Sequence, residues 1–231
     1  MLGIGIGISP ILGGGKAKSS LLNGLISSWS LNNNLNDNLG VYNGIGTNIT
    51  YVSGQFGNAA YHDGTSSIDF GNFAAISSTS KFSLSYWIKC TTKSVYSHVG
   101  NWNYGTNSGN IYLRNNGNLL DVFIVNGPTT YVYGSYTGFP NNVWTNVIIT
   151  YDGTQTGNAN ILKMYINGSQ ISLSYFGTMP AAMSSTSYNF LVGKIDGLFF
   201  PLIGNIDEIN MWSRVITPAE ITLLQTKAYS F

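Results

Sequence analysis

The chain has 231 residues, of which 43% are hydrophobic and 13% aromatic, whereas charged residues make up only 8%. This length suits one large domain or two small ones, and because no linker-like segment divides the sequence, we expect a single domain. Ten basic and nine acidic residues give a net charge of +1, and the scattered basic residues exclude a nucleic-acid partner, since phosphate binding needs clustered lysine and arginine.

The first twenty residues differ from the rest, and we expect them to form an extended, glycine-rich apolar arm before a domain that spans residues 21–231. Glycine at every second position weakens an independent strand, and so few residues cannot bury their own apolar side chains. The segment is therefore either a loose tail or an arm that neighbouring subunits hold in place, and we adopt the second alternative. The apolar residues of this predicted assembly arm are Ile4, Ile6, Ile8, Ile11 and Leu12.

Signals for export and cross-linking are weak in this sequence. The N-terminus is apolar but has neither a basic n-region nor a small-residue cleavage site, so we expect no secretory signal. No segment has the length and apolarity of a membrane span. Cys90 is the only cysteine, which excludes an intrachain disulfide, and its place in an alternating strand predicts a buried thiol.

Apolar residues alternate with polar ones along most of the domain and predict short strands separated by glycine, asparagine or proline turns. Residues 32–48 are rich in asparagine and are expected to form a long surface loop with Asx turns. The clearest strand is Lys81–Cys90, whose even-numbered positions are all apolar, so we expect a half-buried antiparallel strand. Further strands are predicted at 66–70, 95–100, 110–114, 119–125, 130–136, 143–151, 162–167 and 190–193. This pattern predicts an all-β, antiparallel jelly-roll β-sandwich.

The segment 204–225 predicts the last core strand and one short C-terminal helix. Successive strand side chains point to opposite faces, so the neighbours Asp207 and Glu208 are expected to face opposite ways. Thr217 is the predicted N-cap, Pro218 takes the first helical position and Glu220 completes a capping box. The buried stripe of this helix is expected to consist of Ile221, Leu223 and Leu224.

The run GNIDEINMWSRVITPAEI, residues 204–221, resembles the closing signature of the laminin G-like, concanavalin A-like jelly-roll domains. Other stretches resemble the opening, second, central and following strands of that family and occur in the family's order. They are GLISSWSL at 24–31, GQFGNA with YHDG at 54–64, WTNVIITYDG at 144–153 and KMYING at 163–168. The resemblance covers residues 24–228 and implies one jelly-roll sandwich that ends in the short helix.

Some members of the family hydrolyse glycosides, a reaction that needs two carboxyl groups roughly 5 to 9 Å apart. The laminarinase-like members carry their acids at alternate positions of one strand, and this sequence has no such pair. Its acidic residues are Asp37, Asp63, Asp69, Asp121, Asp152, Asp196, Asp207, Glu208 and Glu220. The two histidines, His62 and His98, are expected to be structural. We therefore expect no catalytic residues and no enzymatic activity, and keep a hydrolase with dispersed acids as an alternative.

The resemblance also implies a structural calcium ion near loops at the sheet edge, with Asp63 and Asp207 as the positions that match the family's ligands. Calcium takes about six to eight oxygen ligands, several of them charged. Here Ser66 and Ser67 stand where many members have acidic residues. The alternative is that Asp63 forms a turn and Asp207 binds backbone amides. No other cofactor is expected.

Glycan binding requires aromatic rings that stack on sugar faces and polar groups that reach hydroxyls. Trp102 and Tyr104 alternate with asparagines in one predicted loop, and Tyr131 and Tyr133 lie two positions apart, so that they share one strand face. These four residues are the predicted glycan-binding residues. The alternative is that their rings pack on the sheet.

Three functions remain compatible with the sequence. The first is a structural or attachment subunit of a multi-subunit particle, a bacteriophage virion protein that displays a lectin-like domain and is made in the host cytoplasm. Its partners would be other copies or other virion subunits, held by the arm, and a cell-surface glycan. The alternative is a free carbohydrate-binding or adhesion lectin on a bacterial surface, and the third is a glycoside hydrolase.

Overall fold

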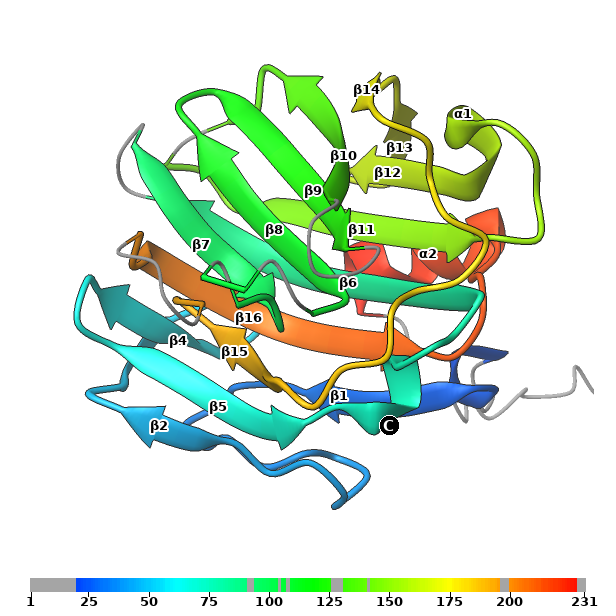
Figure 1. Ribbon diagram of the computed structural model, residues 1–231. Coiled ribbons are helices and arrows are strands. Elements are labelled where there is room, and N and C mark those ends of the chain that lie inside the picture. The colour runs from blue at the N-terminus through cyan, green and yellow to red at the C-terminus, as the bar shows by residue number, and fades with distance from the viewer. Residues whose placement is uncertain are drawn as a thin grey trace, which may run out of the picture.

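The computed structural model describes residues 20–90, 94–103, 105–106, 109–125, 131–140, 142–195 and 200–227. Within these residues the chain forms two antiparallel sheets of eight strands each, packed face to face (Figure 1). The predicted all-β antiparallel sandwich is therefore confirmed. The predicted assembly arm, with Ile4, Ile6, Ile8, Ile11 and Leu12, lies outside the described residues.

The first sheet has the longest strands at its centre. In spatial order its strands are β13 (Ser169–Ile171), β12 (Leu162–Ile166), β11 (Thr145–Asp152), β6 (Lys81–Cys90), β16 (Ile203–Trp212), β4 (Asn58–Asp63) and β3 (Thr50–Ser53). Strand β1 (Leu25–Trp29) pairs with the second half of β16, next to β4. Strand β16 therefore has β6 along one side and both β4 and β1 along the other.

The second sheet lies in front of the first in Figure 1. In spatial order its strands are β14 (Ser174–Phe176), β10 (Tyr131–Thr137), β9 (Leu119–Val125), β8 (Ile111–Asn116), β7 (Val95–Gly100), β15 (Asn189–Val192), β5 (Ser67–Asn72) and β2 (Ile45–Thr47). Two short 3-10 helices, Ser20–Leu22 and Ala74–Ile76, and the single-turn helix α1 (Asn158–Ile161) lie in the described connections. The second α-helix is α2 (Pro218–Thr226).

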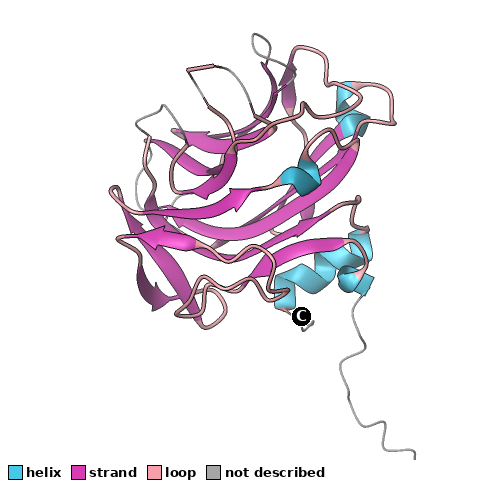
Figure 2. Ribbon diagram, turned by 60° about the horizontal axis from the view of Figure 1, so that its bottom comes forward, coloured by secondary structure: helices cyan, strands magenta, loops and turns pink. Residues whose placement is uncertain are grey.

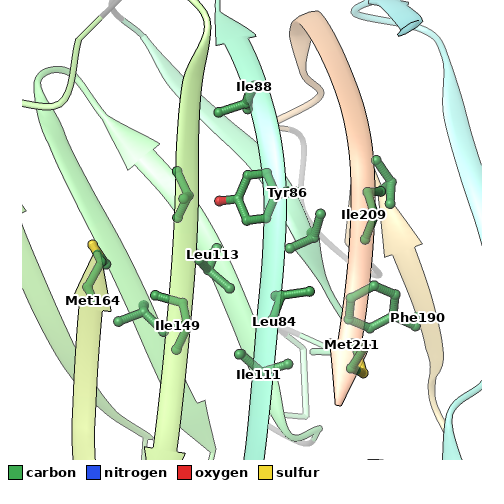
Figure 3. Close-up of a cluster of buried hydrophobic side chains, with 14 of the residues drawn as sticks. Leu84, Tyr86, Ile88, Ile111, Leu113, Ile149, Met164, Phe190, Ile209 and Met211 are labelled. Carbon is green, nitrogen blue, oxygen red and sulfur yellow. The ribbon is translucent and has the colours of Figure 1, made fainter. Parts of the chain in front are cut away.

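The main hydrophobic core lies between the two sheets, and β6 supplies its centre. Leu84, Tyr86 and Ile88 point inward from this strand, as the alternation predicts (Figure 3). The expectation of a half-buried strand is wrong, because its outward face is covered as well. Ser83 on that face is fully buried, and its hydroxyl donates a hydrogen bond of 2.8 Å to the carbonyl of Arg214, just before α2.

Strand β16 contains a β-bulge, and the expectation that Asp207 and Glu208 face opposite ways is therefore wrong. Its register against β6 shifts between Asp207 and Asn210, where Glu208 adopts a left-handed φ of 52°. The bulge turns Ile209 back toward the core and leaves the Asp207 and Glu208 side chains on the same outward side. There, Glu208 forms an ion pair with Lys227 at the end of α2. The two neighbouring acids therefore do not face opposite ways.

The asparagine-rich segment forms a loop, as predicted, and Asp37 organises it. The buried Asp37 carboxylate accepts backbone N–H hydrogen bonds from Ser28 at 3.0 Å, Leu39 at 3.1 Å and Tyr42 at 3.0 Å. Asn34 closes an Asx turn by accepting from the N–H two residues later, at 2.9 Å. The loop is shorter than expected, because residues 45–47 pair as β2 with β5.

Helix α2 begins where the sequence predicts and packs on the outer side of the first sheet (Figure 2). The Thr217 hydroxyl accepts from the Glu220 N–H at 3.3 Å, and the Glu220 carboxylate accepts from the Thr217 N–H at 2.8 Å, so the capping box is confirmed. Ile221 and Leu224 are buried, whereas Leu223 is only partly covered. In the part of the chain that the structure describes, neither helix has the length or apolarity to cross a membrane.

Candidate functional site

An aromatic row crosses the outer face of the second sheet. Tyr112 on β8, Phe123 on β9, Tyr133 on β10 and Phe176 on β14 lie directly opposite one another in the strand register. Their ring centroids are 5.6 Å, 5.1 Å and 5.2 Å apart in that order. Because cross-strand neighbours on one face are close together, four adjacent strands place four rings in a continuous series.

The aromatic row becomes more exposed toward the edge strand β14. Trp102 packs on Tyr112 and Phe123 and buries that end of the row, and Trp102 itself is only 2% exposed. At the other end Phe176 is 57% exposed, and its ring stacks on Tyr133 with an angle of 19° between the planes. The accessible part of the row is therefore the part on β10 and β14.

A polar row runs beside the aromatic row, two residues from it on each strand that the two rows share. It consists of Ser97, Arg114, Asp121, Ser135 and Ser174, which are again paired across β7, β8, β9, β10 and β14. The Arg114 Nε donates a hydrogen bond of 3.3 Å to Asp121 Oδ2, and the Ser135 hydroxyl donates to Asp121 Oδ1. Hydrogen-bonding groups thus lie two residues from the exposed rings on the same strand face.

The structure brings three of the four predicted glycan-binding residues together. The rings of Trp102 and Tyr131 are 5.5 Å apart, and those of Tyr131 and Tyr133 are 6.4 Å apart. Tyr131 is 38% exposed, whereas the buried Trp102 supports the other rings from the side. Tyr104 lies outside the described residues.

Sequence reasoning missed the ring at the exposed end of the row. Phe176 belongs to a strand of three residues, which is too short to show a period-2 pattern. Arg114 and Asp121 were also missed as site residues, although both lie in predicted strands. Their signal was available, because each is a charged residue two positions from an aromatic one, Tyr112 and Phe123 respectively, on the same strand face.

Asp63, the first predicted calcium ligand, holds a turn at the end of β4. Its Oδ1 accepts hydrogen bonds from the Thr65 N–H at 2.8 Å, the Thr65 hydroxyl at 2.9 Å and the Ser66 hydroxyl. The hydrogen bond from the Ser66 side chain, followed by those from Thr65, keeps the pKa of this carboxyl well below its usual range.

Asp207, the second predicted calcium ligand, lies buried under the loop that follows β3. Its Oδ2 accepts the backbone N–H groups of Gln55 at 2.9 Å and Phe56 at 3.0 Å. A Cβ atom at Gly54 would lie only 2.6 Å from this oxygen, which shows how closely the loop covers the carboxyl group. Burial raises the pKa of Asp207 to about 7, although the two N–H hydrogen bonds favour the charged form.

The two predicted calcium ligands belong to separate structural elements. In the pairing of β4 with β16, Asp63 lies opposite Ile203, four residues from Asp207. Among the described residues no three His, Cys, Asp or Glu side chains form a group that could hold a metal ion. The geometry corresponds to the alternative in which Asp63 forms a turn and Asp207 binds backbone amides.

The acidic residues that the structure describes have hydrogen-bond or ion-pair partners within the fold. Asp207 has the perturbed pKa expected of a catalytic acid, but it is fully buried beneath Phe56, so a glycosidic bond could not reach it. The acids with hydrogen-bond or ion-pair partners are Asp37, Asp63, Asp69, Asp121, Asp152, Asp207, Glu208 and Glu220. Asp196 lies outside the described residues.

Both histidines are buried in the fold, and burial lowers the pKa of each to about 4, which keeps the rings neutral. His98 lies in the core within 2.9 Å of the Tyr86 hydroxyl and 3.0 Å of Asn115 Oδ1. The Cys90 thiol is also buried there, and burial raises its pKa to about 12. These groups are therefore placed for packing and hydrogen bonding inside the sandwich.

The fold is a two-sheet antiparallel β-sandwich whose outer aromatic row is exposed at one end. Residues 62–222 match the family described as the concanavalin A-like lectin/glucanases superfamily, in its laminin G branch. The chain belongs to this superfamily, as the match covers more than half of its length. A comparison with curated proteins finds no match.

Solved structures share the fold. Domain 4 of AbnA, a GH43 extracellular arabinanase from Geobacillus stearothermophilus solved with arabinotriose, is 24% identical with a TM-score of 0.64, and the match covers 87% of this chain and 98% of that domain. The binding domain of Paraclostridial Mosquitocidal Protein 1 is 16% identical with a TM-score of 0.69, over 90% of this chain and 53% of the other.

A third similar structure is that of botulinum neurotoxin type C, whose cell entry depends on interaction with two ganglioside molecules. It is 16% identical with a TM-score of 0.67, and the match covers 91% of this chain and 52% of the toxin chain. The chain thus spans about half of the length of the two toxin chains. At these identities the likeness shows the fold alone.

Proposed function

We propose that this protein is a non-catalytic, lectin-like domain that binds a glycan on the outer face of its second sheet. The observation that carries the proposal is the exposed end of the aromatic row, Tyr133 and Phe176, with Tyr131 beside it and the polar row along its edge. The C–H face of a sugar is apolar and packs on an aromatic ring, while the sugar hydroxyls need nearby polar partners. Grouped, exposed apolar side chains rimmed by polar residues commonly mark a binding site.

The comparisons support binding rather than catalysis. The arabinanase domain was solved with arabinotriose, and the type C neurotoxin interacts with gangliosides. None of the three similar structures is described as a virion protein. We therefore favour the carbohydrate-binding lectin, which the sequence analysis kept as the alternative, over the virion subunit. A place on a bacterial surface goes with this proposal.

Replacing Phe176 or Tyr133 by alanine is expected to weaken glycan binding at least about fivefold each, because one stacked ring contributes about 1 kcal/mol beyond its buried area. Phe176→Ala should leave the fold intact, since the ring lies largely outside the core. A glycan array first ranks candidate ligands. The affinities of the wild type and the variants are then measured by NMR titration with arabinotriose and with the ligands that the array ranks highest.

Ile45→Ala is the matched control, because Ile45 is 75% exposed on β2 at the opposite edge of the same sheet. We expect this variant to bind like the wild type. Glycan binding that survives Phe176→Ala and Tyr133→Ala together would place the site elsewhere. A protein that binds no sugar on the array would overturn the proposed function.

Assembly through the first twenty residues, on which the less favoured virion alternative depends, remains a prediction. Light scattering should give a higher mass for the full chain than for a truncated chain that begins at Ser20, and the truncated chain should remain folded. Equal, monomeric masses would show that the segment does not drive self-association. Because the glycan-binding face involves other residues, this outcome would leave the binding proposal unaffected.

A further inference from the structure

Arg114 is held in a fixed position at the centre of the polar row. Its Nε donates to Asp121 Oδ2 at 3.3 Å, and its guanidinium carbon lies 4.8 Å from the ring centroid of Phe123 in the aromatic row. The Asp121 side chain is only 5% exposed and also accepts from Ser135, so the acid that holds Arg114 is itself fixed. Few conformations remain for the arginine, which lowers the entropy that a ligand contact would cost.

The terminal nitrogens of Arg114 remain available to a ligand. Within the described residues neither Nη1 nor Nη2 donates a hydrogen bond, and the side chain is 22% exposed. Toward β14 the polar row continues with Ser174, whose hydroxyl can donate and accept, and with Ser135, whose hydroxyl donates to Asp121 and can accept from a ligand. A ligand on the exposed rings therefore meets donors and acceptors together at its edge.

The charge of Arg114 is cancelled locally by Asp121. Among the described residues of the aromatic and polar rows these two are the charged side chains, and they form an ion pair with each other. A sugar carboxylate that approached the arginine would also approach the aspartate, so attraction and repulsion would nearly balance while the carboxylate lost water. Sugar hydroxyls carry no such penalty and can hydrogen-bond to both partners.

On these grounds, and resting on the proposed function, we propose that the Arg114–Asp121 pair selects a neutral saccharide and disfavours acidic sugars. Arg114 donates to hydroxyl oxygens of a sugar whose apolar face lies on Tyr133 and Phe176. Asp121 has two roles. It fixes the position of Arg114, and its negative charge offsets the positive charge of Arg114 that would otherwise attract anionic ligands. The ligand class is thus a neutral oligosaccharide with neighbouring hydroxyl groups.

The first test uses probes that differ only in charge. Trigalacturonate is compared with its methyl ester, and 3'-sialyllactose with its methyl ester, by NMR titration of the wild-type chain at about 20 mM and about 300 mM salt, where the screening length differs severalfold. We expect each neutral member to bind at least about as tightly as its acidic counterpart, with affinity that changes less than about twofold with salt. Tighter binding of the acidic members that weakens severalfold with salt would overturn the proposal.

The second test removes one charge without changing shape. Asp121→Asn should shift the preference toward the acidic member of each pair by about tenfold, because the arginine charge is no longer balanced. Asp152→Asn is the matched control, since Asp152 forms an ion pair of 3.2 Å with Lys81 in the first sheet, and we expect no shift. Thermal unfolding of both variants confirms that they are folded.

An unchanged preference in folded Asp121→Asn would overturn the role of the pair. If that variant is unstable, Arg114→Gln tests the same role of the pair. The affinity for neutral saccharides should fall about tenfold in this variant, and an unchanged affinity would overturn the proposal. These failures differ from failure of the proposed function. In that case no sugar, neutral or acidic, would bind in a manner that depends on Phe176.

Discussion

Raising the pH from about 4 to about 8 is expected to remove as much as about 4 kcal/mol of stability through Asp207 alone, at 1.36 kcal/mol for each unit of pKa difference. Burial raises the pKa of this carboxyl from 3.8 to about 7 in the folded protein. Between those values the unfolded chain releases the proton while the folded chain keeps it. The contribution is therefore complete below pH 3.8, falls as the pH rises toward 7, and is constant above that.

The groups around Asp207 set this shift. After burial, the Phe56 N–H favours the charged form and the neighbouring Glu208 carboxylate opposes it, and Lys227 at the end of α2 favours it again. In the described part of the chain, Asp207 Oδ1 is buried and has no hydrogen-bond partner. An ionised Asp207 would thus have one oxygen out of contact with any compensating donor, which is why the neutral acid is preferred.

The contribution of Asp207 can be isolated from those of other titrating groups. Arg214 lowers the pKa of Glu220 to about 2, so the contribution of that group is lost at low pH instead. The two buried histidines also lower the stability of the fold as the pH falls below 6.5, because the unfolded chain then binds protons that the folded chain does not. We therefore compare urea unfolding of the wild type and Asp207→Asn at each pH, so that these effects cancel. The wild-type advantage should shrink steadily between pH 4 and 7, and a difference that is independent of pH would refute the shift.

Replacing Trp212 by alanine is expected to lower the free energy of unfolding by about 3 to 5 kcal/mol, the usual cost of removing a large buried aromatic side chain. Trp212 is fully buried between the first sheet and α2, where it packs with Ile148, Ile221 and Leu224. Its indole N–H also donates a hydrogen bond of 2.7 Å to the carbonyl of Leu21. The substitution would leave a cavity and would remove this buried hydrogen bond.

Trp212→Phe divides this effect into two parts. The smaller ring keeps most of the packing but loses the hydrogen bond, so we expect a loss of about 1 to 2 kcal/mol. Val143→Ala is the control at an exposed site, where the change should stay within about 0.5 kcal/mol. Urea unfolding gives all three values. A Trp212→Ala variant within about 1 kcal/mol of the wild type would show that α2 contributes little to the fold.

Local signals made the strands and the helix start predictable. The alternation over Lys81–Cys90 matches β6 residue for residue, and Thr217, Pro218 and Glu220 form the capping box that their spacing indicates. Tyr131 and Tyr133 share a face because period 2 holds without interruption in β10. In each case the determining residues are neighbours in the sequence, so the pattern itself contains the information.

What could not be predicted depends on contacts between distant segments. The bulge at Glu208 is fixed by pairing with β6, and the burial of Asp207 depends on amides of Gln55 and Phe56, more than 150 residues earlier in the chain. Phe176 becomes part of the candidate site only because its short strand pairs with β10. Trp102 is likewise buried because rings from three other strands pack against it.

The described ends of the chain are fastened together on one side of the molecule. Arg214 donates hydrogen bonds to the carbonyls of Ser20 and Asn23, beside α2 and the outer side of the first sheet. The exposed rings lie on the outer side of the second sheet, which faces the opposite direction (Figures 1 and 2). A molecule attached through this side of the first sheet to a chip, a bead or a larger protein therefore presents Phe176 and its neighbours toward the solution, where a dissolved oligosaccharide can reach them.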